Sequence, residues 1–189
     1  MSGPELTRGE RRKQQTSERL LDAALRLFLS RGYESVSTAD IAAAADVGAG
    51  TFYLHFKDKR DIFVAIGKRT ADEVISKWSG AMRPGMSAAE MVTGMLRLGA
   101  EVWQQSPERA RLLLEAGPPI EAQGYVGLTE DVAKALEQAG CKTTVPLAVL
   151  ANLIVALTFQ LGRLVLAGKG EDVSSVVDGA SRLISKALS

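Results

Sequence analysis

Residues 35–56, SVSTADIAAAADVGAGTFYLHF, contain two helix-start signals in quick succession, and this spacing constrains the fold more than any other feature. Ser37 and Asp40 have the spacing of a capping box, in which each residue caps a backbone amide of the other. Val36 and Ile41 flank the box at the spacing of a hydrophobic staple. We therefore predict a helix that begins just after Ser37.

A second helix is predicted after the turn at 46–48. Val47 and Phe52 repeat the staple spacing, and Gly48 interrupts the run of small residues that ends the first helix. At about 100° per residue, Phe52 and Phe56 lie on one side of the second helix, toward a core. The two helices form a helix-turn-helix, and the alternative is an ordinary helical hairpin with its polar side in water.

The opposite side of the second helix is small and polar around one leucine. Gly50, Thr51 and Leu54 point away from the phenylalanines, and Tyr53 and His55 flank them. Such a face, with no long charged residue at its centre, suits a nucleic-acid groove. We predict that Leu54 covers a thymine methyl group. Its alternative is packing on a neighbouring loop.

Charged residues follow this helix at once. Asp58 is placed to cap a third helix, with Asp61 at its third helical position, which puts Lys59 at a helix N-terminus. A lysine ammonium beside the free backbone amides of a helix N-terminus forms a binding site for a DNA phosphate. We therefore predict that removal of Lys59 flattens the salt dependence of DNA binding. The alternative is a solvated charge cluster.

Residues 17–66 resemble the N-terminal domain of TetR-type (tetracycline-repressor-like) transcriptional regulators. The most specific part is GTFYLHFKDK, residues 50–59, which fits the pattern G-T-[LF]-Y-x-H-F-x-x-K. The chain departs from the family at Asp46 and Gly48, where Gly and Ser are usual, and at Ala49, which is commonly polar. The resemblance and the outward face together predict DNA contacts from Thr38, Ala49, Gly50, Thr51, Tyr53, Leu54, His55, Lys57 and Lys59.

The amino-acid composition indicates the cellular compartment and excludes several classes of enzyme. The single cysteine, Cys141, excludes an intrachain disulfide, and one histidine excludes a Cys/His metal cluster, so a reducing cytoplasm fits. We find no paired carboxylates on one helix face, no Gly-rich phosphate loop and no nucleophile with a histidine base. We therefore predict neither an enzyme nor a cofactor. Residues 1–69 hold 12 Lys and Arg against 9 Asp and Glu, which places positive charge on the predicted helix-turn-helix.

Helical periodicity continues without strand alternation, so the predicted fold class is all-α. Residues 1–16 lack apolar periodicity and are predicted to be a flexible basic arm, which either touches phosphates or a minor groove or only aids solubility. The DNA-binding domain is predicted at 17–69, and a helical ligand-binding and dimerisation domain at 70–189. Outside the helix-turn-helix, helices are predicted at 17–29, 59–82, 88–103, 107–116, 120–139, 144–167 and 173–188.

The apolar stretch at 144–167 is long enough to consider as a membrane span. Pro146, Asn152, Gln160 and Arg163 interrupt it, so we predict a buried helix and no membrane partner. The last two helices carry more apolar surface than one small domain covers. We predict that they pair with a second copy in a four-helix interface, and the alternative is burial within the monomer.

These features together predict a ligand-responsive regulator that binds double-stranded operator DNA. It is expected to be a repressor released from a palindromic operator when a small hydrophobic or aromatic effector changes the tilt of the helix at 59–82. The alternative is a helical interaction module that binds no DNA. Large apolar side chains and flexible methionines suit an effector cavity. The predicted ligand contacts are Trp78, Met91, Met95, Trp103, Arg111, Tyr125, Asn152, Phe159 and Gln160.

Overall fold

The computed structural model describes residues 7–83, 85–116, 122–168 and 173–188, which form nine α-helices and one π-helical segment without a strand. The predicted all-α fold class is confirmed. The chain divides into two units, made mainly of Met1–Gly67 and of Lys68–Glu115 with Pro119–Ser189. This division lies two residues before the predicted domain boundary.

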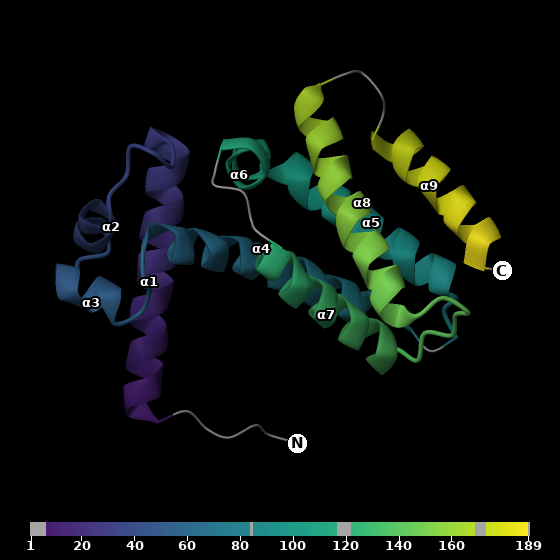
Figure 1. The fold of residues 1–189 in the computed structure, drawn as a ribbon, viewed down its shortest axis with the longest axis horizontal. Coiled ribbons are helices and arrows are strands. Elements are labelled where there is room, and N and C mark those ends of the chain that lie inside the picture. The colour runs from purple at the N-terminus through teal and green to yellow at the C-terminus, as the bar shows by residue number, and fades with distance from the viewer. Residues whose placement is uncertain (1–6, 84, 117–121, 169–172, 189) are drawn as a thin grey trace. The chain divides into compact units, whose positions relative to one another are not determined.

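The first unit is a small helical domain (Figure 1). Its core is built around buried aromatic side chains. It contains α1 (Arg8–Arg31), α2 (Thr38–Ala44), α3 (Ala49–Tyr53) and the first part of α4 (Lys59–Ala81). Helix α2 packs on α1, and α3 packs on α2. The buried side chains include Leu20, Leu21, Phe28, Tyr33, Val36, Ile41, Phe52, Phe56, Ile62, Phe63 and Ile66.

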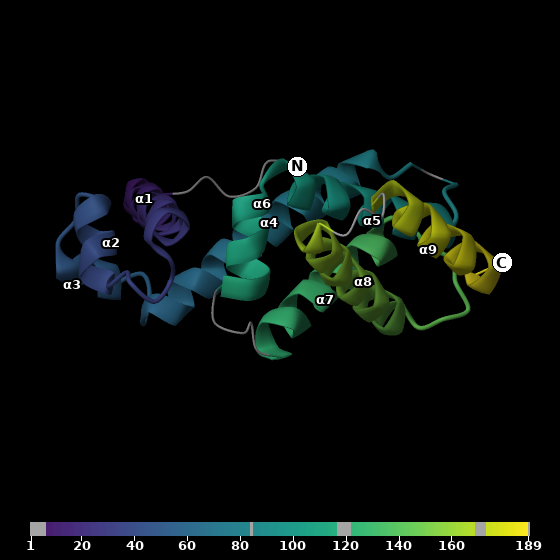
Figure 2. The same ribbon diagram turned by 90° about the horizontal axis from the view of Figure 1, so that it is seen from above.

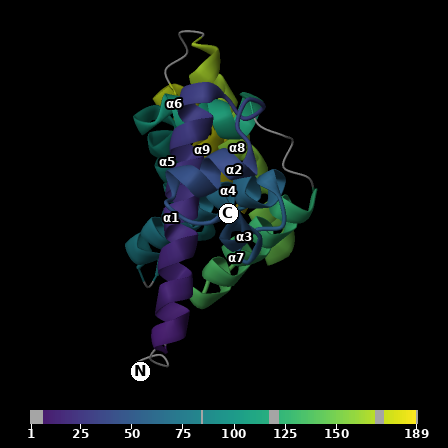
Figure 3. The same ribbon diagram turned by 90° about the vertical axis from the view of Figure 1, so that its left-hand side faces the viewer.

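Helix α1 begins at Arg8, so the prediction of a helix starting only at residue 17 was wrong. The Thr7 side chain accepts a hydrogen bond from the Glu10 amide, and the Glu10 carboxylate accepts one from the Thr7 amide at 2.8 Å. This capping box places most of the predicted basic arm on an ordered helix. Figures 1 and 3 show the first turns of α1 projecting beyond α2 and α3. Residues 1–6 lie outside the described residues.

The second unit is arranged around one apolar helix. After the last part of α4 it contains α5 (Ala88–Gln105), α6 (Pro107–Arg111), the π-helical η1 (Leu112–Ala116), α7 (Ala122–Gln138), α8 (Leu147–Ala167) and α9 (Val173–Leu188). Helices α5, α6, α7 and α9 all pack against α8, and α5 also packs along α9 (Figure 2).

Helix α8 is long and apolar enough by length and composition to cross a membrane, with a mean hydropathy of 1.9. Its inner face, which includes Leu150, Ile154 and Leu161, is buried against the neighbouring helices. This face of α8 is therefore packed as in a core helix, although only 39% of the most apolar window of the helix is buried, and the absence of a membrane partner stays a prediction.

Two helix bounds in this unit differ from the prediction for identifiable reasons. Helix α8 begins at Leu147 instead of residue 144, because Pro146 occupies the position before its first turn and disfavours helical conformation in the residue that precedes it. The helix predicted at 107–116 is α-helical only to Arg111 and continues as π-helix. The helix predicted at 88–103 is α5, which begins at a capping box of Ser87 and Glu90 and continues to Gln105.

Candidate nucleic-acid interface

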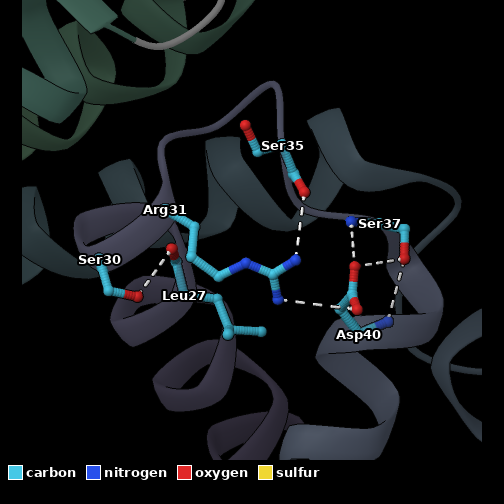
Figure 4. Close-up of polar contacts among 6 residues, drawn as sticks. All are labelled: Leu27, Ser30, Arg31, Ser35, Ser37 and Asp40. Carbon is cyan, nitrogen blue, oxygen red and sulfur yellow. Dashed lines mark hydrogen bonds and ion pairs between the residues drawn. The ribbon is translucent and has the colours of Figure 1, made fainter.

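The start of α2 is fixed by the predicted capping box. The Ser37 hydroxyl accepts a hydrogen bond from the Asp40 amide at 3.1 Å, and Asp40 Oδ2 accepts from the Ser37 amide at 2.9 Å. The Ser37 hydroxyl also donates to Asp40 Oδ2 at 2.7 Å, and this bond, then the one from the Ser37 amide, with a smaller contribution from Arg31, hold the pKa of the Asp40 carboxyl below its usual value. Figure 4 shows Arg31 of α1 beside this box, with Nη1 3.7 Å from Asp40 Oδ1. The capping box places Thr38 at the first position of α2.

The turn between α2 and α3 contains a strained residue. Asp46 has φ of 52°, the only positive φ outside glycine in the described residues. Aspartate tolerates this left-handed conformation better than most residues, which explains how the chain can lack the usual glycine here. The Val47 amide donates to Ala42 O at 3.0 Å and closes the turn.

Helix α3 has the predicted two-sided character. Phe52 and Phe56 are 0% and 7% exposed, whereas Tyr53 and Leu54 are 60% and 76% exposed. Leu54 therefore does not pack on a neighbouring loop among the described residues. The helix ends at Tyr53, so Leu54 and His55 follow in the turn after it. Gly50 is exposed, and a Cβ there would have nothing within 4 Å, so the backbone of this face is open to close approach.

Two hydroxyl groups meet on the outward side of α2 and α3. Thr38 Oγ1 and Tyr53 Oη are 3.1 Å apart and hydrogen-bonded. The Tyr53 ring packs edge-on against the buried Phe52, with ring centroids 5.3 Å apart, and this contact orients the phenol. The structure therefore brings together two of the predicted DNA contacts that lie 15 residues apart in the chain.

The start of α4 is capped as predicted, but the Lys59 side chain is already engaged within the domain. Asp58 Oδ1 accepts from the Asp61 amide at 2.8 Å. Lys59 Nζ donates to Tyr33 O at 2.9 Å and to Glu34 O at 3.3 Å, and lies 4.3 Å from the Tyr33 ring centroid. The contact of Lys59 with phosphate stays a prediction.

Lys57 and His55 lie on either side of Phe56. Lys57 is exposed, and His55 is half-buried. Burial, with a smaller contribution from the charge of Lys13, lowers the pKa of His55 below its ordinary value. Lys13 belongs to the first turns of α1, so these turns bring basic side chains close to the end of α3. We considered DNA contact from this segment as a flexible arm but missed its helix, although the T-x-x-E pattern at residues 7–10 is a sequence signal for this helix start.

The apolar residues predicted to contact a ligand lie in the second unit, mostly in its core. Trp78, Met91 and Met95 are buried, and the Trp78 indole N–H donates to Met91 O at 2.8 Å. The Trp103 indole N–H donates to Thr158 O at 3.1 Å, and its ring lies 6.1 Å from that of the half-buried Phe159. Both indoles are thus held by internal hydrogen bonds.

The polar residues predicted to orient a ligand are exposed. Arg111, Asn152 and Gln160 all lie at the surface of their helices, and Asn152 donates to Ala148 O at 3.0 Å, one turn earlier in α8. The side chain of Tyr125 lies outside the described residues. The structure therefore does not group these polar side chains with the buried tryptophans.

One face of α8 carries uncovered apolar side chains. Val149 and Leu153 are 48% and 54% exposed, one turn apart, and Leu183 of α9 is 73% exposed. Asn152 lies beside them on the same helix. The last two helices thus leave apolar surface uncovered in the single chain, as the sequence predicted.

Comparison with known proteins agrees with the helix-turn-helix geometry. Residues 20–66 match the family described as "Bacterial regulatory proteins, tetR family". The HTH-type transcriptional regulator AcrR of Shigella flexneri is 51% identical over 53 residues, which are 28% of this chain and 25% of AcrR. The first unit is therefore similar to the helix-turn-helix domain of tetR-family regulators, and the resemblance drawn from the sequence is confirmed.

Other matches extend over both units. The HTH-type transcriptional repressor KstR of Mycolicibacterium smegmatis is 27% identical over 184 residues, 93% of this chain and 90% of KstR. The structure of FadR from Bacillus subtilis in complex with stearoyl-CoA has a TM-score of 0.62 at 17% identity, and the match covers 88% of this chain and 96% of FadR. For the first curated relatives, however, the matched part spans only 25% to 53% of their own length.

Proposed function

We propose that this chain is a sequence-specific DNA-binding transcriptional regulator whose outward α3 face enters the major groove. The observation that carries the proposal is the joined hydroxyl pair of Thr38 and Tyr53 beside the 76% exposed Leu54. Hydroxyl donors suit phosphate oxygens, whereas an exposed leucine among small residues suits a thymine methyl group. The relatives reported above are named as transcriptional regulators.

The proposed contacts divide into two kinds. Thr38, Tyr53 and Lys57 would bind phosphates and set the position of the domain on the duplex. Ala49, Gly50, Thr51 and Leu54 would approach base edges, and their small size favours close apolar contact over bidentate hydrogen bonds. His55 and Lys59 complete the interface, with the Lys59 backbone amide at the start of α4 directed to phosphate.

We further propose a homodimer formed by α8 and α9, with the exposed Val149, Leu153 and Leu183 in the interface. Two-fold symmetry then requires a palindromic operator with half-sites about one helical turn apart or somewhat more. Sedimentation tests this directly. We expect Leu153→Glu to yield monomers, while Leu29→Glu, at a similarly exposed site on α1, leaves the dimer intact. A wild-type monomer at micromolar concentration would contradict it.

The second unit is proposed to bind a small apolar effector that releases the protein from DNA in the cytoplasm. The buried methionines and tryptophans between α4, α5 and α8 support this role, because methionine adapts to ligands of varied shape. Acyl-CoA thioesters are the first class to test, since FadR was solved with stearoyl-CoA. Because linkage is reciprocal, DNA must weaken effector binding by the factor with which the effector weakens DNA binding.

The competing possibility is a helical interaction module that kept the helix-turn-helix only as structure. A genome-wide footprint of the purified protein separates the two. We expect a small set of protected sites with two-fold symmetry, which would also reveal the regulated genes. Absence of salt-dependent DNA binding would favour the interaction module.

A further inference from the structure

Two arginines of α1 hold α2 at its two ends. At the N-terminal end, Arg31 donates to Ser35 O at 3.5 Å and pairs with Asp40 (Figure 4). At the C-terminal end, Arg19 Nη2 donates to Ala45 O and, at 3.1 Å, to Asp46 O. Helix α2 has only seven residues, too few to be stable by itself. Its orientation therefore depends on contacts of this kind.

The Arg19 contacts satisfy a specific need of the helix end. The last carbonyls of a helix have no amide partner within it, and the negative end of the helix dipole favours a cation. Arg19 supplies its charge and a hydrogen bond to the carbonyl of Ala45, the residue that caps α2, and its second bond reaches Asp46 in the turn beyond the helix. Its ion pair with the Asp46 carboxylate, at 3.5 Å, joins exposed groups and contributes little, so the two carbonyls are the partners that matter.

The same contacts reach the strained residue of the turn. Asp46 has φ of 52°, and α3 begins only three residues later at Ala49. A change in the backbone at Asp46 would therefore rotate α3 and the side chains on its outward face. Arg19 binds the carbonyl of this very residue, from a helix whose side chains at this level are packed in the domain core.

We propose that Arg19 is a positioning residue for DNA recognition, which fixes the direction of α3 by holding the carbonyls of Ala45 and Asp46. This proposal rests on the proposed function, because Arg19 would set the orientation of the α3 side chains that are proposed to contact DNA. In this role Arg19 acts through the turn and needs no contact with DNA. Arg31 performs the corresponding task at the other end of α2.

The test compares specific with non-specific binding. The probes are the duplex most strongly protected in the footprint and poly(dI-dC), and the variants are Arg19→Ala and, as control, Arg26→Ala, which removes an exposed arginine from the same helix. We expect Arg19→Ala to bind the specific duplex about tenfold more weakly, with unchanged poly(dI-dC) binding and an unchanged salt slope. Arg26→Ala should match wild type.

A second substitution tests whether Arg19 acts through the turn. Glycine adopts positive φ without strain, so Arg19→Ala combined with Asp46→Gly should recover part of the lost specific affinity. Asp46→Asn, which removes only the exposed charge, should behave as wild type. Wild-type affinity in Arg19→Ala, a flatter salt slope, or no recovery in the double variant would overturn the proposal.

Hydrogen exchange in the free protein gives a readout that does not need DNA. We expect Arg19→Ala to speed exchange of the Val47 and Thr51 amides, which bond Ala42 O and Gly48 O, while the Gly32 amide at the end of α1 stays unchanged. If the wild-type chain binds no duplex, the proposed function fails. Faster exchange in Arg19→Ala would still show that Arg19 holds the turn between α2 and α3. Unchanged exchange would refute it.

Discussion

The hydroxyl oxygens of Thr38 and Tyr53 lie 3.1 Å apart, although the two residues come from different helices of the helix-turn-helix. Each hydroxyl has one proton, so both can donate to one phosphate oxygen once the bond between them is given up. We expect Thr38→Val and Tyr53→Phe each to weaken operator binding by about tenfold, since a hydrogen bond to a charged group contributes about 1.5–3 kcal/mol.

A double-mutant cycle tests whether the two hydroxyls share a phosphate. The combined variant should lose less affinity than the product of the single losses, because each residue acts through the same phosphate. Thermal unfolding serves as the control, since removal of a hydroxyl at this exposed pair should shift Tm little. If the affinity loss of the double variant equals the product of the two single losses, the hydroxyls contact different groups.

Lys57 and Lys59 are matched lysines with different surroundings, and they should behave differently. Lys57→Met should reduce the salt slope by about 0.9 with little effect on stability, because it removes one exposed phosphate contact. Lys59→Met should lower stability by about 1 kcal/mol or more, because Nζ bonds the carbonyls of Tyr33 and Glu34. A flatter slope in Lys59→Met would support its predicted phosphate contact, and an unchanged slope would remove it.

His55 should make the stability of the free protein depend on pH. Burial lowers its pKa from 6.5 in the folded state, with a smaller effect of Lys13, so the unfolded chain binds this proton more readily. The free energy of unfolding should therefore rise with pH up to about 6.5 and then level off. Urea titrations between about pH 5.5 and 7.5 should show this rise for wild type, and His55→Gln should lose it. An identical rise in the variant would assign it to another group.

Gly99 fixes the close approach of α5 and α8 in the second unit. A Cβ at this position would lie 2.4 Å from Thr158 Cγ2. We expect Gly99→Ala to destabilise the protein by about 1–3 kcal/mol, as overpacking does. Adding Thr158→Ser, which removes that methyl group, should restore much of the loss.

Gly127 on α7 provides the matched control for this prediction. A Cβ there would have nothing within 4 Å, so Gly127→Ala should stabilise by about 0.5–1 kcal/mol through helix propensity. Chemical denaturation measures all three variants. Equal stability of Gly99→Ala and wild type would show that α5 and α8 can move apart at Gly99 without a loss of free energy.

Local signals predicted the helix-turn-helix well because capping and periodicity act over a few residues. Ser37 with Asp40 and Phe52 with Phe56 needed only their neighbours in the chain to be interpreted. The same signal was present at Thr7 and Glu10, but the basic composition that follows it led to the prediction of an arm. Local patterns therefore carried more information than composition.

Contacts between distant residues could not be predicted from spacing. Lys59 bonds the carbonyls of Tyr33 and Glu34, and Arg19 bonds those of Ala45 and Asp46, in each case about 25 residues away. Such partners depend on how α1, α2 and α4 pack, which no capping motif encodes. The same holds for Arg111, Asn152 and Gln160, because only tertiary packing determines whether these side chains point into the domain or to solvent.

The measurement that tests the central claim most directly is a fluorescence anisotropy titration of the footprinted duplex with full-length protein over a range of KCl concentrations. We predict two chains per duplex and an association constant that falls linearly with salt on logarithmic axes, with a slope of about −0.9 for each phosphate bound. Saturation by one chain per palindromic duplex, or an affinity independent of salt, would contradict the account of a dimer that reads DNA through α3.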